Sequence, residues 1–159
     1  MSTILPIAQR GEDVLKLIAA PVADTEFSST WLEELAKALK TTMLERNGVG
    51  IAAPQVYISK RVIIVASRPN PRYPDAPEMD AITMVNPEII EQSIQTVLGE
   101  EGCLSVPNQR GQVARAEQIT VQFLTLKGEK IIQTFHGFPA RIVQHEIDHL
   151  NGVLFVERI

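Results

Sequence analysis

Residues 139–152 read PARIVQHEIDHLNG and predict a helix near the C-terminus. Proline suits the first helical position, and the closing Asn-Gly pair suits a helix end. Val143, Ile147 and Leu150 recur at helical spacing, so one side of this helix is expected to be buried. The other elements are therefore expected to pack around it.

The same helix carries the sequence His145-Glu146-Ile147-Asp148-His149, which has the pattern HExxH. Because positions four apart on a helix share a face, both imidazoles can bind one metal ion. Glu146 follows the first histidine and can reach a water molecule at the metal without binding the metal itself. The pattern predicts a hydrolytic metal site that takes a third ligand from elsewhere in the chain.

The third ligand is expected upstream of the helix. A metzincin would place a histidine at position 155, which is Phe155, and the short segment after His149 leaves little room for a downstream glutamate ligand. The upstream candidates are Cys103, His136 and scattered carboxylates. A lone cysteine is by default a small buried hydrophobic residue. Beside HExxH, however, Cys103 is favoured, because one Cys and two His with an open fourth position form a catalytic coordination set.

The N-terminal half predicts one more helix, followed by strands. A helix is expected at about 31–46, with an apolar stripe that includes Leu39 and a capping box formed by Thr30 and Glu33. Trp31 is expected to pack in the core or at the helix entry. Runs rich in β-branched residues predict strands at 61–66, 82–85, 93–98, 118–126 and 130–135. The predicted fold is α+β, with mostly antiparallel strands packed around the C-terminal HExxH-bearing helix and an N-terminal helix.

Length and charge narrow the class of protein. With 159 residues, the chain is expected to form a single catalytic domain, 1–159. A net charge of -4 argues against direct nucleic-acid specificity, and no apolar run is long enough for a membrane span. A single cysteine fits a reducing compartment, which predicts a cytoplasmic location. The proline-rich segment 68–78 is expected to be an exposed loop, and a passive surface role is favoured over a wall of a substrate cleft.

Residues 48–55 read GVGIAAPQ and form a second distinctive segment. A phosphate-binding loop is excluded because no Gly-Lys-Ser/Thr follows the glycines. A dinucleotide-binding turn is excluded because the third glycine is absent and Pro54 interrupts any helix. Taken alone, this segment predicts a helix end and a tight turn.

Three segments, in this order, resemble the peptide deformylase family. Residues 48–55 match the family pattern GxGxAAxQ, residues 101–105 (EGCLS) match its second motif, and residues 144–150 (QHEIDHL) match its third. The resemblance covers essentially the whole chain. It implies a hydrolase that removes the N-formyl group from the N-terminal formyl-methionine of newly made polypeptides and releases formate.

The resemblance also implies residue roles. The implied metal ligands are Cys103, His145 and His149, with Glu146 as the catalytic acid and base. The groups expected to stabilise the oxyanion are Gln55 and the backbone N–H of Leu104. The residues expected to hold the peptide backbone of the substrate are Gly50 and Arg110, and a supporting pair is expected between Arg115 and Asp148.

The implied cofactor is one divalent metal ion. Iron(II) is expected, with zinc, nickel or cobalt as substitutes, because a thiolate with two imidazoles is compatible with each. The implied partners are nascent chains and, transiently, the ribosome, although the sequence ends at residues 155–159 without the long C-terminal helix of some members. Two alternatives stay open, namely an HExxH peptidase that cleaves internal bonds and a non-catalytic metal-binding or ribosome-binding module.

Overall fold

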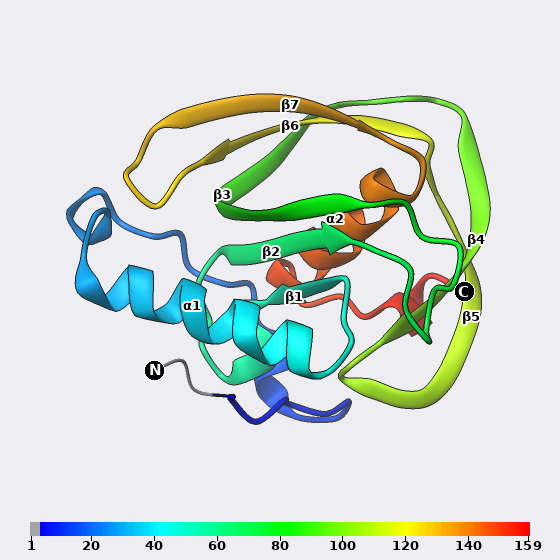
Figure 1. Ribbon diagram of the computed structural model, residues 1–159, viewed down its shortest axis with the longest axis horizontal. Coiled ribbons are helices and arrows are strands. Elements are labelled where there is room, and N and C mark those ends of the chain that lie inside the picture. Colours follow the sequence, from blue (N-terminus) through cyan, green and yellow to red (C-terminus); the bar gives the residue numbers. More distant parts are fainter. Residues whose placement is uncertain (1–3) are drawn as a thin grey trace.

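The computed structural model describes residues 4–159 and contains two α-helices and seven strands. The helices are α1 (Thr30–Glu45) and α2 (Gly137–Leu150). The strands are β1 (Gly50–Ala52), β2 (Val62–Ser67), β3 (Met79–Gln92), β4 (Thr96–Cys103), β5 (Val106–Ala116), β6 (Gln118–Leu124) and β7 (Lys130–His136). The architecture is α+β, as the sequence predicted (Figure 1).

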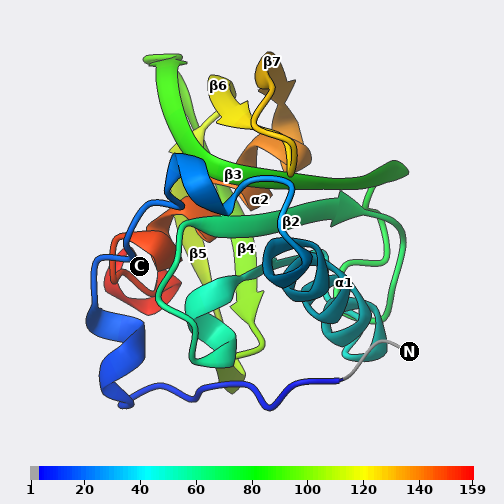
Figure 2. The same cartoon turned by 90° about the vertical axis from the view of Figure 1, so that its left-hand side faces the viewer.

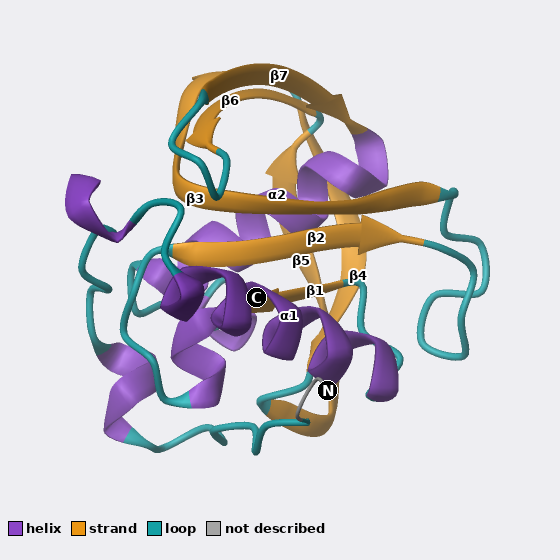
Figure 3. Ribbon diagram, turned by 60° about the vertical axis from the view of Figure 1, so that its left-hand side comes forward, coloured by secondary structure: helices purple, strands orange, loops and turns teal. Residues whose placement is uncertain are grey.

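The strands form two antiparallel sheets. One sheet has the order β1-β2-β3-β6-β7, and the other is the hairpin of β4 and β5. The hairpin runs across the direction of β2 and β3 (Figure 3). The hairpin continues from β3 and into β6 through short connections, where the Ser93 N–H donates to the Gln118 carbonyl at 2.9 Å and the Glu117 N–H donates to the Gln95 carbonyl at 3.1 Å.

The two helices pack on opposite faces of β1 and β2 (Figures 1 and 2). Side chains alternate between the faces of a strand, so Ile63 and Val65 join the core around α2, while Val62 and Ile64 join the core around α1. This double burial explains why β2 is an almost continuous apolar run. No helix within residues 4–159 is long and apolar enough to cross a membrane.

Both predicted helices are present, with corrections at their N-terminal ends. The cap of α1 is Ser29, whose hydroxyl accepts a hydrogen bond from the Leu32 N–H at 3.2 Å, so the predicted box of Thr30 and Glu33 is wrong. Trp31 lies in the first turn of α1 and is 42% exposed, so of its two predicted places, the core and the helix entry, the core is wrong. Helix α2 begins two residues earlier than predicted and ends before Asn151, as expected.

The strand predictions located most strands but not their extents. The runs at 61–66, 118–126 and 130–135 correspond to β2, β6 and β7, whereas 82–85 is only the middle of the long strand β3. Residues 93–95 belong to the turn before β4, so the predicted strand at 93–98 starts too early. Strands β1 and β5 were not predicted. Strand β5 is rich in polar residues and contains a proline and a glycine, and its pairing with β4, not its composition, makes it a strand.

The buried stripe of α1 gives a test of the fold. Leu39 is fully buried against the face of β1 and β2 that α1 covers. We expect Leu39→Ala to lower the free energy of unfolding by about 2–5 kcal/mol, because it removes buried methyl groups and leaves a cavity. Leu44→Ala, at a position on the same helix that is 36% exposed, should cost less than about 1 kcal/mol. Denaturant unfolding of both variants measures the difference, and equal losses would contradict this packing.

Candidate active site

The fold brings Cys103, His145 and His149 together. One ligand atom from each lies within 4.8 Å of the others, and all three residues are buried. Cys103 is the last residue of β4, whereas both histidines project from one side of α2. His136, the other upstream histidine, ends β7 as an exposed residue and does not join this group.

The geometry of this group fits a metal ion. The Cys103 Sγ atom lies 3.4 Å from the His149 Nε2 atom. A thiolate and an imidazole bound to the same tetrahedral ion would be separated by about 3.5 Å, given their usual bond lengths to zinc. The His145 Nδ1 atom lies 2.9 Å from the Glu101 carboxylate, which leaves Nε2 of that ring available as a ligand.

Electrostatics favour the ligand form of Cys103. Burial by itself would raise the pKa of the thiol, but the neighbouring His149 and His145 rings outweigh burial and hold that pKa well below its ordinary value. The thiolate is the form in which cysteine binds metals. The surroundings therefore prepare this side chain for coordination.

Glu146 lies beside the ligand group without belonging to it. The side chain is buried, and its Oε1 atom has no hydrogen-bond partner within the described chain. Burial raises the pKa of Glu146, although the charges of His145 and His149 act in the opposite direction. A buried carboxyl group with a raised pKa is suited to accept and return a proton near neutral pH.

The segment predicted as a helix end and a tight turn places two functional candidates. Gly50 is the first residue of β1, and a Cβ atom there would lie 2.5 Å from the Glu146 Oε2 atom, so only glycine leaves room for the carboxylate. Gln55 lies in the 3-10 helix Ala53–Val56 and is buried. Its Oε1 accepts from the Ala52 N–H at 3.0 Å, while its Nε2 donates to Ser105 at 3.0 Å and lies 3.6 Å from Cys103 Sγ.

Glu101 is a functional residue that reasoning from the sequence missed. Its side chain is buried, and its Oε1 atom faces His145 and Arg115 while Oε2 faces Arg141 and Arg115. Burial would raise the pKa of Glu101, but the hydrogen bonds from Arg115 and His145 lower it far below its usual range. An available signal was its place in the EGCLS segment, two residues before Cys103.

The pair expected between Arg115 and Asp148 is present, with the Arg115 Nη1 atom 2.6 Å from the Asp148 Oδ2 atom. Arg158 also binds the Asp148 carboxylate, at 2.6 Å and 2.9 Å. Arg115 bridges Glu101 and Asp148, so the carboxylates on β4 and α2 share one buried cation. Through Glu101, this network reaches the Nδ1 atom of His145 in the ligand group.

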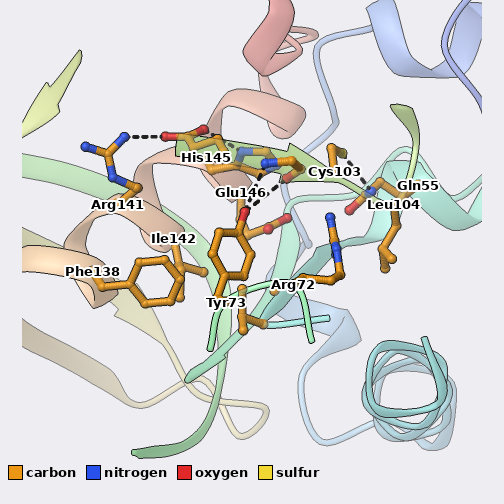
Figure 4. Close-up of a pocket in the computed structure, with 14 residues that line it drawn as sticks. Gln55, Arg72, Tyr73, Cys103, Leu104, Phe138, Arg141, Ile142, His145 and Glu146 are labelled. Carbon is orange, nitrogen blue, oxygen red and sulfur yellow. Dashed lines mark hydrogen bonds and ion pairs between the residues drawn. The ribbon is translucent and has the colours of Figure 1, made fainter. Parts of the chain in front are cut away.

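A pocket opens beside the ligands (Figure 4). Phe138, Ile142 and Tyr73 line its apolar side, and Gln55 and Leu104 lie near Cys103. Arg72 and Tyr73 come from the proline-rich segment, so the expectation of a passive surface loop is wrong. The Tyr73 hydroxyl accepts from the Gly102 N–H at 2.9 Å, and its ring lies 4.9 Å from that of Phe138, which holds the loop against the pocket.

Arg110 lies at the rim and not in this pocket. Its guanidinium donates to Glu100 at 2.9 Å and sits over the Tyr73 ring, 4.8 Å from the ring centre. It lines a neighbouring cavity that shares Tyr73, Phe138 and Arg141 with the main pocket. Arg110 therefore lies next to the pocket, on the side of Tyr73.

A buried ligand group next to an unpartnered carboxylate is the arrangement of a metal-dependent hydrolase. Comparisons with known proteins agree with this class. The family model described as polypeptide deformylase matches residues 4–159. Peptide deformylase 2 from Nostoc sp. is 49% identical over 156 residues, which cover 98% of this chain and 86% of that protein.

Solved structures extend the comparison to the fold. The crystal structure of class I type b peptide deformylase from Acinetobacter baumannii bound to Met-Ala-Ser is 73% identical, with a TM-score of 0.98 and 100% of both chains covered. Peptide deformylase from Thermotoga maritima is 34% identical, with a TM-score of 0.87, and the match covers 99% of this chain and 98% of that one. The chain therefore belongs to the peptide deformylase family. It is a metal-dependent hydrolase that removes the N-formyl group from polypeptides.

The close approach of Gly50 to Glu146 yields a prediction. We expect Gly50→Ala to displace the Glu146 carboxylate and to lower formate release at least about tenfold, because small misplacements of a catalytic group are costly. Metal content should stay unchanged, since no ligand moves. Gly48→Ala is the matched control, because a Cβ there would meet its nearest neighbour, a Leu104 methyl group, at 3.3 Å. Formate assays and metal analysis of both variants check this, and equal activities would contradict it.

Proposed function

We propose that Cys103, His145 and His149 hold one divalent metal ion and that Glu146 acts as the acid and base in deformylation. The observation that carries this proposal is the convergence of three buried ligand atoms, within 4.8 Å of one another, beside the Glu146 carboxylate. An ion bound there would supply Lewis acidity, which makes a water molecule nucleophilic at neutral pH and polarises the formyl carbonyl.

The protein groups then have defined tasks. Glu146 accepts a proton from the attacking water as the C–O bond to the formyl carbon forms. Negative charge develops on the formyl oxygen, and the donors proposed for it are the Gln55 amide and the Leu104 N–H. Glu146 returns the proton to the departing amine as the C–N bond breaks, so that formate and a free N-terminus leave. Because the Ala52 N–H fixes Gln55 Oε1, the amide nitrogen is already directed toward Cys103.

The pocket suits a methionine side chain. Phe138, Ile142 and Val49 provide apolar walls next to the ligand group. The similar protein from Acinetobacter baumannii was crystallised with Met-Ala-Ser, which supports a peptide that begins with methionine as the occupant here. Gly50 and Arg110 are proposed to hold the peptide backbone as it leaves the pocket, and nascent chains carrying formyl-methionine are the proposed substrates.

The proposed site and substrate also bear on the domain organisation and the cellular location of the protein. We propose that residues 1–159 act as a single catalytic domain, because the site draws on β1, the 3-10 helix, β4 and α2 together. Formylated nascent chains arise where ribosomes work, which supports a cytoplasmic location and a transient contact with the ribosome.

Substitution of Glu146 tests the proposed roles. Glu146→Gln should lower formate release from formyl-Met-Ala-Ser by about two to four orders of magnitude, because an amide cannot accept and return the proton. Its metal content and thermal midpoint should stay near those of the unmodified protein. Cys103→Ala is the contrasting variant and should lose metal as well as activity.

The outcomes separate the alternatives. Loss of metal in Glu146→Gln would make Glu146 a ligand, and near-normal activity would make another group the base. The unmodified protein should release formate but leave acetyl-Met-Ala-Ser and internal peptide bonds intact. Cleavage of internal bonds would instead favour an HExxH peptidase.

The proposed native ion is iron(II), with zinc, nickel or cobalt as substitutes. Protein purified without oxygen should contain one iron per chain, measured by elemental analysis. Its activity should decay in air, because an iron-bound thiolate site is open to oxidation, and it should persist after exchange to nickel or cobalt. Zinc in anaerobically purified protein, or equal decay of the iron and nickel forms, would count against iron.

A further inference from the structure

The ligand group is divided between two parts of the fold. Cys103 ends a strand of the β4–β5 hairpin, whereas His145 and His149 lie on α2. Backbone hydrogen bonds at residues 93–95 and 117–118 join the base of the hairpin to the five-stranded sheet on which α2 packs, whereas Cys103 lies at the opposite end, next to the turn between β4 and β5. Side chains that reach from α2 to the hairpin therefore help to set the distance between the thiolate and the imidazoles. Gln144 on α2, for example, bonds both the N–H and the carbonyl of Ala116 at the base of the hairpin.

Arg141 makes such a connection. It lies on α2, four residues before His145, and is buried. Its Nη2 atom donates to the Val97 carbonyl at 2.7 Å on β4, and its Nη1 atom donates to the Val113 carbonyl at 2.8 Å on β5. One guanidinium thus binds the backbone of both hairpin strands.

The same guanidinium also acts on a ligand through Glu101. Arg141 Nη1 donates to Glu101 Oε2 at 2.7 Å, an interaction drawn in Figure 4. The other oxygen of that carboxylate, Oε1, lies 2.9 Å from His145 Nδ1. Groups that bind the second nitrogen of a metal-binding histidine set the orientation of its ring. Arg141 therefore influences the position of Cys103 through the hairpin and the orientation of His145 through Glu101.

The hairpin is shaped for an arginine at this position. A Cβ atom at Gly99 would lie 2.7 Å from the guanidinium carbon of Arg141, so glycine provides the space that the side chain fills. The planar guanidinium can donate to several acceptors at once, whereas a lysine ammonium is a compact charge that cannot span them. The contacts with Val97, Val113 and Glu101 therefore require the several N–H donors of a guanidinium.

We propose that Arg141 is a positioning residue that sets the separation between Cys103 and the histidines of α2 and orients His145 through Glu101. This inference rests on the proposed ligand set. Arg115 also links β4, β5 and α2 and pairs with Glu101. Loss of Arg141 thus leaves the Glu101 carboxylate paired, so the expected effect is a loosened metal site in a folded protein.

The test uses cobalt(II) and the metal-free protein, with no activity assay. Competition against a chelator should show that Arg141→Met binds cobalt about 10- to 100-fold more weakly than the unmodified protein. The absorption bands of bound cobalt, which report thiolate coordination and ligand geometry, should shift. Arg141→Lys keeps a charge near Glu101 and should give an intermediate affinity, and it carries the test if the methionine variant does not fold.

Arg61→Met is the matched control. Arg61 donates to the Leu150 carbonyl at 3.0 Å and to Asn151 at 3.1 Å, so it ties down the far end of α2 without contacting the hairpin. This variant should keep the cobalt affinity and spectrum even if its thermal midpoint falls. Unchanged affinity and spectrum in Arg141→Met, or an equal loss in Arg61→Met, would overturn the proposal. Unchanged cobalt binding in Cys103→Ala would instead overturn the ligand set of the proposed function.

Discussion

The buried carboxylate of Glu101, on β4, bonds side chains of β5 and α2 and so connects the three elements around the ligand group. It receives hydrogen bonds from Arg115 on β5 and from Arg141 on α2, and it contacts the Nδ1 atom of His145. A buried charge is tolerated only when it is paired and hydrogen-bonded, because its desolvation is costly. The need to satisfy this carboxylate therefore constrains where α2 can lie on the β4–β5 hairpin.

This constraint accounts for the unusual character of α2. Every residue from Ala140 to Leu150 is buried, although the segment includes charged and polar side chains as well as apolar ones. Its apolar residues pack on β1, β2 and β6, while Arg141 and Asp148 find partners in the network. The two histidines face Cys103, and Glu146 fills the space that Gly50 leaves. One helix thus serves both packing and the site, because its apolar side chains pack on the sheet while its charged and imidazole side chains join the network and the ligand group.

Much of the site could be predicted, since its groups lie in short motifs with fixed spacing. The HExxH pattern indicated a helix with both imidazoles on one side, and the single cysteine narrowed the search for a third ligand. The roles of Tyr73, Glu101 and Arg141 could not be predicted in this way. Tyr73 lies in a proline-rich loop with no periodic pattern, and Arg141 becomes informative only when its partners on β4 and β5 are known. Strand β5 escaped prediction for a similar reason, because its polar composition carries no strand signal without β4 beside it.

Features that depend on neighbours along the chain could be read from the amino-acid sequence. These are the two helices, most of the β-branched strands and the local spacing of the HExxH residues. The contacts between distant residues became known from the folded protein, namely Cys103 with His149, Glu101 with His145, and Gly50 with Glu146. The physical reason is that helical periodicity and β propensity act over a few residues, whereas the pairing of buried charges is settled only when separate elements pack together.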